Sequence, residues 1–449
     1  MVAPFQLNWP DFVARYWRKQ PVHFRKLFPT EFLAKHDAFR ILSAASKSAN
    51  KPGEQVALRF FVDKSYREFD ARGFLPSNDA SIEDYTRRVT EALNGRGFAV
   101  VLNKAHTWDI GLWRQARGFV KGLYSEIGVP ESTDAVIWYS RTEVTGFGVH
   151  EDPIDNLLVM LDGRKRFRMW APEVLQRHPH LVGHAGYESI LGEAQTFDLE
   201  PGDVLYIPQG YYHVSEAGSE PALQLSILMA VHKHYWIESI QRDATKLIDS
   251  RLSKVEKSQT IPSFQPDKAR RSPEMPENLN TMLEAFESIG TDLRLAVSRK
   301  WLARLSGLGL EAAPKQEPRE LKDTDTVWVD PSEPVLFQVQ EGQLLGAIYG
   351  HSFAVQAHPK LVELFRDLNS GQKYKVRELI KKHSGEATVR KKQYALDAAF
   401  IRSMLGRLYS MRAIQVEEAA ARPARSSTKL PVKRATKPSA KKRVRSEAR

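Results

Sequence analysis

The 449-residue chain contains no cysteine. A disulfide framework, a zinc site built on thiolates and a cysteine nucleophile are therefore all excluded. No apolar run approaches the roughly eighteen uninterrupted residues that a membrane-spanning helix requires, so we expect no membrane partner. The N-terminal stretch MVAPFQLNWP also lacks the basic-then-apolar order of a signal peptide. Together these absences predict a cytoplasmic protein, and the length of 449 residues predicts two to four domains.

Outside one terminal stretch, the chain has little excess of positive charge. The formal net charge is +12, and eleven Lys or Arg residues against one Glu lie between Arg422 and Arg449, which leaves only +2 for the rest. This distribution argues against a nucleic-acid-binding fold. The segment 421–449 is almost free of apolar residues, so we expect a disordered tail. Loose, sequence-indifferent contact with RNA or the ribosome is its candidate role.

A buried lysine is predicted from the pattern around Asp162-Gly163. This dipeptide lies between two apolar runs and predicts a two-residue hairpin in which Met160 pairs with Lys165. Alternating side chains of the two strands would then share one face. That face would hold Asn156, Leu158, Met160, Lys165, Phe167 and Met169. Burying an ammonium costs several kcal/mol unless an anion meets it, so Lys165 indicates a binding site.

Three further residues form a candidate metal set. His150 and Asp152 stand two apart, so on a strand both side chains reach the same side. His213 ends the stretch PGDVLYIPQGYYH, which reads as a turn, a strand and a loop. Two imidazoles and one carboxylate are the facial ligand set of non-haem Fe(II) oxygenases. A His-x-Asp pair taken alone is more often a surface loop, and the prediction depends on its combination with His213 and Lys165.

The stretches HEDPIDNLLVMLDGRKRFRMWAP and EPGDVLYIPQGYYHVSEA resemble the JmjC-type cupin hydroxylases. Within them they are most similar to the ribosomal oxygenases, which hydroxylate ribosomal proteins. The resemblance implies an α+β fold around a double-stranded β-helix (cupin) core, with Fe(II), 2-oxoglutarate and O₂ as cofactors. His150, Asp152 and His213 would ligate the iron, and Lys165 would bind the distal carboxylate of 2-oxoglutarate. Asn156 matches an asparagine near the cosubstrate in a related asparaginyl hydroxylase.

Other residues of the predicted pocket are less sharply defined. On the last core strand, Gln224 and Ser226 share one face, and we take Ser226 as the candidate contact of the cosubstrate with Gln224 as the alternative. The strand entering the site carries Trp138 and Tyr139, which we expect to contact substrate. Family members often have Asn-x-Tyr where this chain has Val136, Ile137 and Trp138, so the target residue stays open. Tyr211 would either line the pocket or pack on the barrel rim.

The chain divides into five predicted segments. These are an N-terminal cap (1–94), the catalytic core (95–231), a helical region (232–310), a winged-helix-like domain (324–416) and the tail (421–449). In the helical region, one helix over Asn278–Leu308 carries an apolar stripe. The equivalent helices dimerise in the ribosomal oxygenases, so we expect a homodimer. In the winged-helix-like domain, Glu363 and Asp367 on the first helix favour protein interaction over DNA binding.

The leading prediction is an Fe(II)- and 2-oxoglutarate-dependent dioxygenase that hydroxylates a protein or peptide side chain, with a ribosomal-protein-like target favoured. A cupin isomerase would want a second histidine where Asp152 stands. A lysine demethylase shares the chemistry, although the chain lacks Cys-rich zinc modules. A dedicated peptide substrate fits the altered Val136–Trp138 strand. A non-catalytic nucleic-acid-binding regulator is a further alternative, but it gives no role to His150, Asp152 and His213.

Overall fold

A computed structural model describes residues 7–28, 32–49, 58–63, 65–66, 71–142, 147–217, 220–230, 235–252, 275, 277–389 and 392–418. The predicted tail 421–449 lies outside these residues. No helix within the described ranges is both long and apolar enough to cross a membrane.

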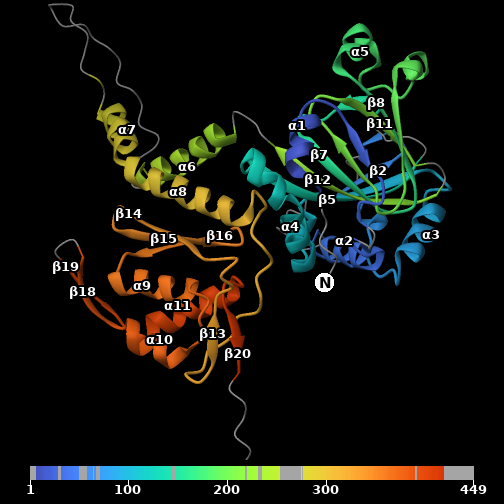
Figure 1. The fold of residues 1–449 in the computed structure, drawn as a ribbon. Helices are drawn as coiled ribbons and strands as arrows, with labels where there is room; N and C mark the ends of the chain where they lie inside the picture. The colour runs from blue at the N-terminus through green and yellow to red at the C-terminus, as the bar shows by residue number, and fades with distance from the viewer. Residues whose placement is uncertain are drawn as a thin grey trace, which may run out of the picture.

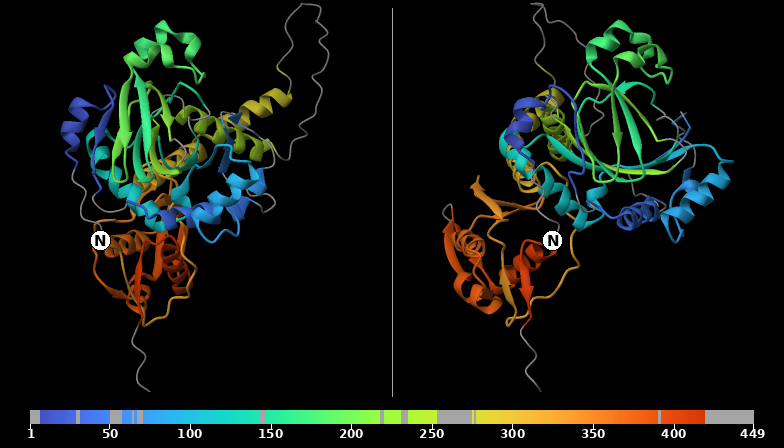
Figure 2. Two further views of the ribbon diagram at one scale, coloured as in Figure 1. Left: turned by 90° about the vertical axis from the view of Figure 1, so that its right-hand side faces the viewer. Right: turned by 45° about the vertical axis from the view of Figure 1, so that its right-hand side comes forward.

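The centre of the molecule is a β-sandwich of two antiparallel sheets (Figures 1 and 2). The larger sheet has the strand order β1 (Val22–Phe24), β10 (Val204–Ile207), β7 (Asp155–Asp162), β12 (Ala222–Ala230), β5 (Ser132–Arg141), β4 (Phe98–Leu102), β2 (Leu58–Val62) and β3 (Ser65–Tyr66). The smaller sheet has the order β6 (His150–Glu151), β11 (Tyr212–Glu216), β8 (Lys165–Trp170) and β9 (Gln195–Leu199). The predicted α+β class with a cupin core is confirmed.

The predicted Asp162-Gly163 hairpin is wrong. Strand β7 pairs with β10 and β12 in the larger sheet, whereas β8 pairs with β11 and β9 in the smaller one. The dipeptide turns the chain from one sheet to the other. Gly163 has φ +73°, and an added Cβ would lie 2.2 Å from the Pro221 carbonyl oxygen, so only glycine fits this corner. The side chains predicted to share one face, among them Asn156 and Lys165, still point into the same space, because the inner faces of the two sheets are opposite one another.

The N-terminal segment shares a sheet and a core with the barrel. Strands β1, β2 and β3 extend the larger sheet, and the outer face of that sheet packs against helices. Trp113 and Phe119 of α4 belong to the same core cluster as Tyr139 of β5 and Leu157 of β7. The helices and 3₁₀ turns here are α1 (Trp9–Arg15), α2 (Lys35–Ala49), η1 (Ala71–Phe74), α3 (Ile82–Ala92), η2 (Ala105–Thr107) and α4 (Ile110–Ile127). Between β8 and β9 lie α5 (Pro172–Arg177), η3 (Pro179–Leu181) and η4 (Glu188–Glu193).

The helical region contains α6 (Tyr235–Leu252), α7 (Glu277–Ser288) and α8 (Gly290–Gly307). The single helix predicted over Asn278–Leu308 is therefore interrupted, because Ile289 separates α7 from α8. The apolar stripe divides with it. Phe286 on α7 is 60% exposed, whereas Ile289 and Leu302 are buried.

The C-terminal unit has its own hydrophobic core. Its elements are β13 (Thr326–Trp328), β14 (Leu336–Gln340), β15 (Gln343–Ile348), β16 (His351–Gln356), α9 (Pro359–Asn369), β17 (Tyr374–Lys375), α10 (Val376–His383), β18 (Gly385–Val389), β19 (Lys392–Leu396), α11 (Ala398–Ser410) and β20 (Gln415–Glu417). The last helix begins at Ala398, because Asp397 caps it and accepts a hydrogen bond from the Phe400 N–H. Helix α8 lies across β15 and β16 (Figure 1).

Candidate metal and dicarboxylate site

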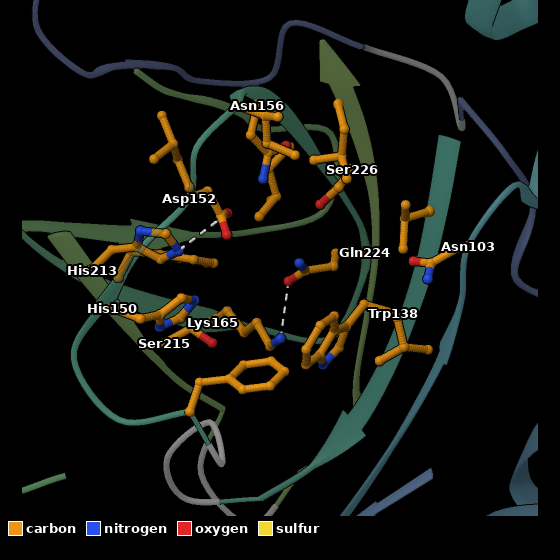
Figure 3. A pocket seen from close by; sticks show the side chains of 18 of the residues that line it. Asn103, Trp138, His150, Asp152, Asn156, Lys165, His213, Ser215, Gln224 and Ser226 are labelled. Carbon is orange, nitrogen blue, oxygen red and sulfur yellow. Dashed lines mark hydrogen bonds and ion pairs between the residues drawn. The ribbon is translucent and has the colours of Figure 1, made fainter. Parts of the chain in front are cut away.

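A cavity of about 160 Å³ lies between the two sheets of the barrel. Figure 3 shows polar side chains from both sheets converging on it. Seven of the predicted site residues line this cavity, and they are His150, Asp152, His213, Lys165, Asn156, Ser226 and Trp138. These residues come from β5, β7, β12 and the smaller sheet, so the fold brings together positions up to 88 residues apart in the sequence.

His150, Asp152 and His213 form a compact group. Their potential ligand atoms all lie within 4.8 Å of one another, and His213 Nε2 is 3.8 Å from Asp152 Oδ2. Strand pairing explains the convergence, since His213 on β11 is the direct cross-strand partner of His150 on β6. One ion can contact all three side chains.

The two imidazoles are held in the tautomer that a metal needs. His150 Nδ1 lies 2.9 Å from the Gly148 carbonyl oxygen, and His213 Nδ1 lies 3.2 Å from the Tyr211 carbonyl oxygen. A carbonyl only accepts hydrogen bonds, so each Nδ1 carries the proton and each Nε2 presents a lone pair. Burial and the neighbouring His150 lower the pKa of His213 to about 4, while Asp152 opposes this shift. His213 is thus neutral near pH 7, as a ligand must be.

Lys165 is the buried cation that the sequence predicts. It is 3% exposed, and its ammonium donates a hydrogen bond of 2.9 Å to Gln224 Oε1. Among the described residues, no carboxylate lies within ion-pair distance of Lys165 Nζ. Burial alone lowers the pKa of Lys165 to about 7. A buried ammonium with only a neutral partner is suited to an anionic ligand.

The remaining polar lining residues face the same space. Asn156 and Ser226 are both 6% exposed, and Asn156 Oδ1 has no hydrogen-bond partner among the described residues. Gln224, kept as the alternative to Ser226, also lines the cavity and holds Lys165. Both belong to the inner face of β12, because they stand two residues apart.

An aromatic wall closes the side of the cavity next to Lys165. The Trp138 ring stacks on Phe61, with centroids 5.9 Å apart and planes at 17°. Phe147 meets both rings edge-on at 5.2 and 5.9 Å. Lys165 Nζ lies 5.6 Å from the Trp138 ring centre. Phe61 and Phe147 were not predicted, because neither lies on the core strands whose alternation revealed the pocket.

Two predicted residues lie elsewhere. Tyr139 is buried in the core behind the larger sheet and hydrogen-bonds Thr86, since neighbours on a strand face opposite ways and Trp138 already faces the cavity. Tyr211 does not line the cavity either, and its hydroxyl donates a hydrogen bond of 3.3 Å to the Lys19 carbonyl. Tyr139 therefore cannot contact a substrate in this cavity, whereas a substrate contact of Tyr211 stays a prediction. Arg59, Asn103 and Ser215 line the cavity without having been predicted.

A second buried charge fixes the segment between Asp152 and Asn156. The carboxylate of Asp155 is fully buried. Its Oδ2 lies 3.1 Å from Arg18 Nε, and its Oδ1 accepts hydrogen bonds from the Tyr206 hydroxyl at 2.6 Å and the Gln209 N–H at 3.3 Å. This cluster ties β7 to β10 and to the N-terminal segment, and so it sets the position of the neighbouring cavity residues.

Comparisons with known proteins agree with this geometry. A family model described as the JmjC domain matches residues 125–236. The ribosomal protein uL16 3-hydroxylase of Escherichia coli (strain K12) is 26% identical over 224 residues, which are 49% of this chain and 52% of that protein. The bifunctional lysine-specific demethylase and histidyl-hydroxylase NO66 of Caenorhabditis elegans is 25% identical over 221 residues, 45% of this chain and 24% of that protein.

Among solved structures, the Escherichia coli ribosomal oxygenase YcfD in complex with cobalt and 2-oxoglutarate aligns with 92% of this chain and 99% of its own, at 16% identity and a TM-score of 0.46. The chain spans about half or less of the length of the two curated relatives. The JmjC-domain match and both curated relatives cover this core, and over it the chain is similar to the ribosomal oxygenases.

Proposed function

We propose that this protein is an Fe(II)- and 2-oxoglutarate-dependent oxygenase that hydroxylates a side chain of a protein or peptide. The observation that carries the proposal is the buried Lys165 ammonium, which has no anionic partner among the described residues and shares one cavity with the His-Asp-His group. A ligand that bridges the two features must offer a carboxylate to Lys165 and further oxygens to a metal. 2-Oxoglutarate has this form.

In this mechanism, His150, Asp152 and His213 would hold the Fe(II) ion. When bound, Fe(II) and 2-oxoglutarate supply the activation of O₂ that inserts one oxygen atom into a C–H bond, with release of CO₂ and succinate. Lys165 binds the distal carboxylate, and Gln224 keeps its ammonium directed into the cavity. Asn156 and Ser226 offer further polar contacts, and the apolar wall around Trp138 excludes water.

A ribosomal protein is the favoured substrate, because the relatives include a ribosomal protein 3-hydroxylase. The C. elegans relative is also named as a lysine demethylase, so demethylation is the second candidate. A dedicated peptide is the third, supported by Val136 and Trp138 where family members often have Asn and Tyr. Trp138 is the one predicted substrate contact that still lines the cavity.

The metal assignment is tested with purified protein and Fe(II). We expect one Fe(II) bound per chain and conversion of 2-oxoglutarate to succinate. His150→Ala or Asp152→Ala should abolish turnover, because two remaining ligands cannot hold a labile ion. His184→Ala, in the exposed loop after η3, is the matched control and should retain it. Full turnover in either ligand variant would refute the assignment.

We also propose a homodimer formed through α7. Met282, Leu283 and Phe286 are 42%, 51% and 60% exposed. Three neighbouring exposed apolar side chains form a patch, and such patches mark interaction sites more often than single exposed apolar side chains do. Light scattering should give a dimer for the unmodified protein and a monomer for Leu283→Glu with Phe286→Glu. A monomer at tens of micromolar before any substitution would contradict the proposal.

The tail 421–449 is proposed to attach the enzyme loosely to RNA or the ribosome in the cytoplasm, where a ribosomal target is met. The tail has eleven Lys or Arg residues and no aromatic residue. This composition suits contacts to phosphates and does not suit the recognition of nucleobases. Truncation after Ala420 should weaken RNA binding and leave turnover of a short peptide unchanged. If the truncated protein binds RNA as tightly as the full chain does, the tail does not have this role.

A further inference from the structure

Half of the Lys and Arg residues of the C-terminal unit lie in one stretch of the sequence. Between Gln372 and Lys392, eight Lys or Arg residues stand against two Glu, whereas the remainder of residues 311–418 has eight bases against thirteen acids. An acidic unit thus carries one strongly basic segment, which comprises β17, α10 and the β18–β19 hairpin. Figure 1 places α10 and this hairpin on the side of the unit away from the barrel.

Helix α10 divides cleanly into a buried and a basic face. Val376, Leu379 and His383 are buried in the core of the unit. Arg377 and Lys381 stand one helical turn apart and are exposed, and Lys375 is exposed directly before the helix. We call Lys375, Arg377 and Lys381 the basic surface.

These three bases are not neutralised within the described part of the chain, where none of them has an ion-pair partner. Their basic neighbours are different. Lys373 Nζ lies 2.7 Å from Glu417 Oε2, and Lys382 Nζ lies 2.6 Å from Asp367 Oδ2. The one acid on the exposed side of α10, Glu378, accepts the Lys375 N–H at 3.1 Å and so serves to cap the helix. Three charges therefore remain for a partner.

The composition of this surface favours a phosphate backbone over a protein. Protein interfaces have an apolar, aromatic-rich centre. Among the described residues, no large apolar side chain is exposed on β17 or α10. Exposed lysine and arginine without apolar neighbours instead match sequence-independent contacts to nucleic acid.

The basic surface also adjoins the point from which the basic tail departs. Strands β17 and β20 both pair with β13, and Lys373, directly before β17, contacts Glu417 at the end of β20. The eleven bases of the tail follow within a few residues.

We infer that the basic surface of Lys375, Arg377 and Lys381 binds the phosphate backbone of RNA. The choice of RNA rests on the proposed function, because a ribosomal protein substrate is surrounded by ribosomal RNA. This assignment replaces the protein-interaction role expected from Glu363 and Asp367 on α9, since Asp367 is occupied by Lys382 and His383.

The test uses the full chain and a mixed-sequence RNA hairpin in a fluorescence anisotropy titration at several salt concentrations. The variant combines Lys375→Glu, Arg377→Glu and Lys381→Glu. The matched control combines Lys315→Glu, Lys360→Glu and Arg366→Glu, which changes the charge of the same unit equally but lies outside the basic surface. Thermal unfolding and turnover of a short peptide are measured for all three proteins.

We expect the variant to bind on the order of 10- to 100-fold more weakly, with the slope of log affinity against log salt smaller by about 3, one for each lost phosphate contact. The control should stay close to the unmodified protein. Equal losses in both would mean that net charge alone matters, and an unchanged variant would mean that α10 does not touch RNA. Either result overturns the inference. The titration needs neither iron nor 2-oxoglutarate, so failure of the proposed oxygenase activity would be seen separately.

Discussion

Two buried charges, one at the start of β7 and one at the start of β8, have opposite surroundings. Asp155 has its carboxylate fully buried, and it is met by Arg18, Tyr206 and the Gln209 N–H. Lys165 is 3% exposed, and among the described residues its ammonium contacts two neutral groups, the Gln224 amide and the Trp138 ring. The first charge is satisfied within the fold and stabilises it. The second costs stability in the free protein, which is the pattern expected where a ligand brings the missing charge.

The largest expected effect is the loss of the satisfied charge. Asp155→Ala would leave Tyr206 and the Gln209 N–H without their acceptor, so we expect the free energy of unfolding to fall by about 3 kcal/mol. Chemical denaturation measures this. Arg18→Gln is the matched change on the other side of the pair and should cost less, about 1 kcal/mol, because the Arg18 side chain is 40% exposed. An Asp155→Ala protein as stable as the original would contradict the structural role.

Removal of the unsatisfied charge should have the opposite effect on stability. Lys165→Met should raise the melting temperature of the ligand-free protein, because a desolvated ammonium is replaced by an apolar chain of similar length. The same change should weaken 2-oxoglutarate binding by about 30- to 1000-fold, or roughly 2–4 kcal/mol, as one charge-assisted contact is lost.

Arg166→Met is the control on the same strand, since Arg166 faces out and pairs with Asp198. Calorimetric titration of the Mn(II)-loaded protein measures affinity without turnover. Unchanged affinity in Lys165→Met would show that the distal carboxylate binds elsewhere.

The smallest expected effect is on pH dependence. The pKa of Lys165 is lowered to about 7, and a bound carboxylate favours the charged ammonium and raises it. Below pH 7 the ammonium is already charged, so affinity for 2-oxoglutarate should be flat there. Above pH 7 binding must take up a proton, so affinity should fall by up to about tenfold for each pH unit. This decline should vanish in Lys165→Met, and its persistence there would assign it to another group.

Strand alternation alone predicted most of the site. The two-residue spacing of His150 and Asp152, and the inward parity of Asn156 and Lys165, depend only on the pleat of a strand. The same rule should have excluded Tyr139 once Trp138 was assigned to the cavity. These features follow from a few consecutive residues, and so the sequence determines them.

Only the tertiary structure decided which strands become neighbours. The Asp162-Gly163 dipeptide turns the chain equally well within one sheet or between two, and Pro221, far along the chain, fills the space at that corner. The partner of Lys165, the aromatic wall of Phe61 and Phe147, and the three ligands of Asp155 are likewise contacts between distant segments. The break at Ile289 is decided by packing too, since that side chain is buried while Phe286, one turn earlier, is exposed. The sequence determined which side chains of each strand face inward, and long-range packing determined which residues those side chains contact.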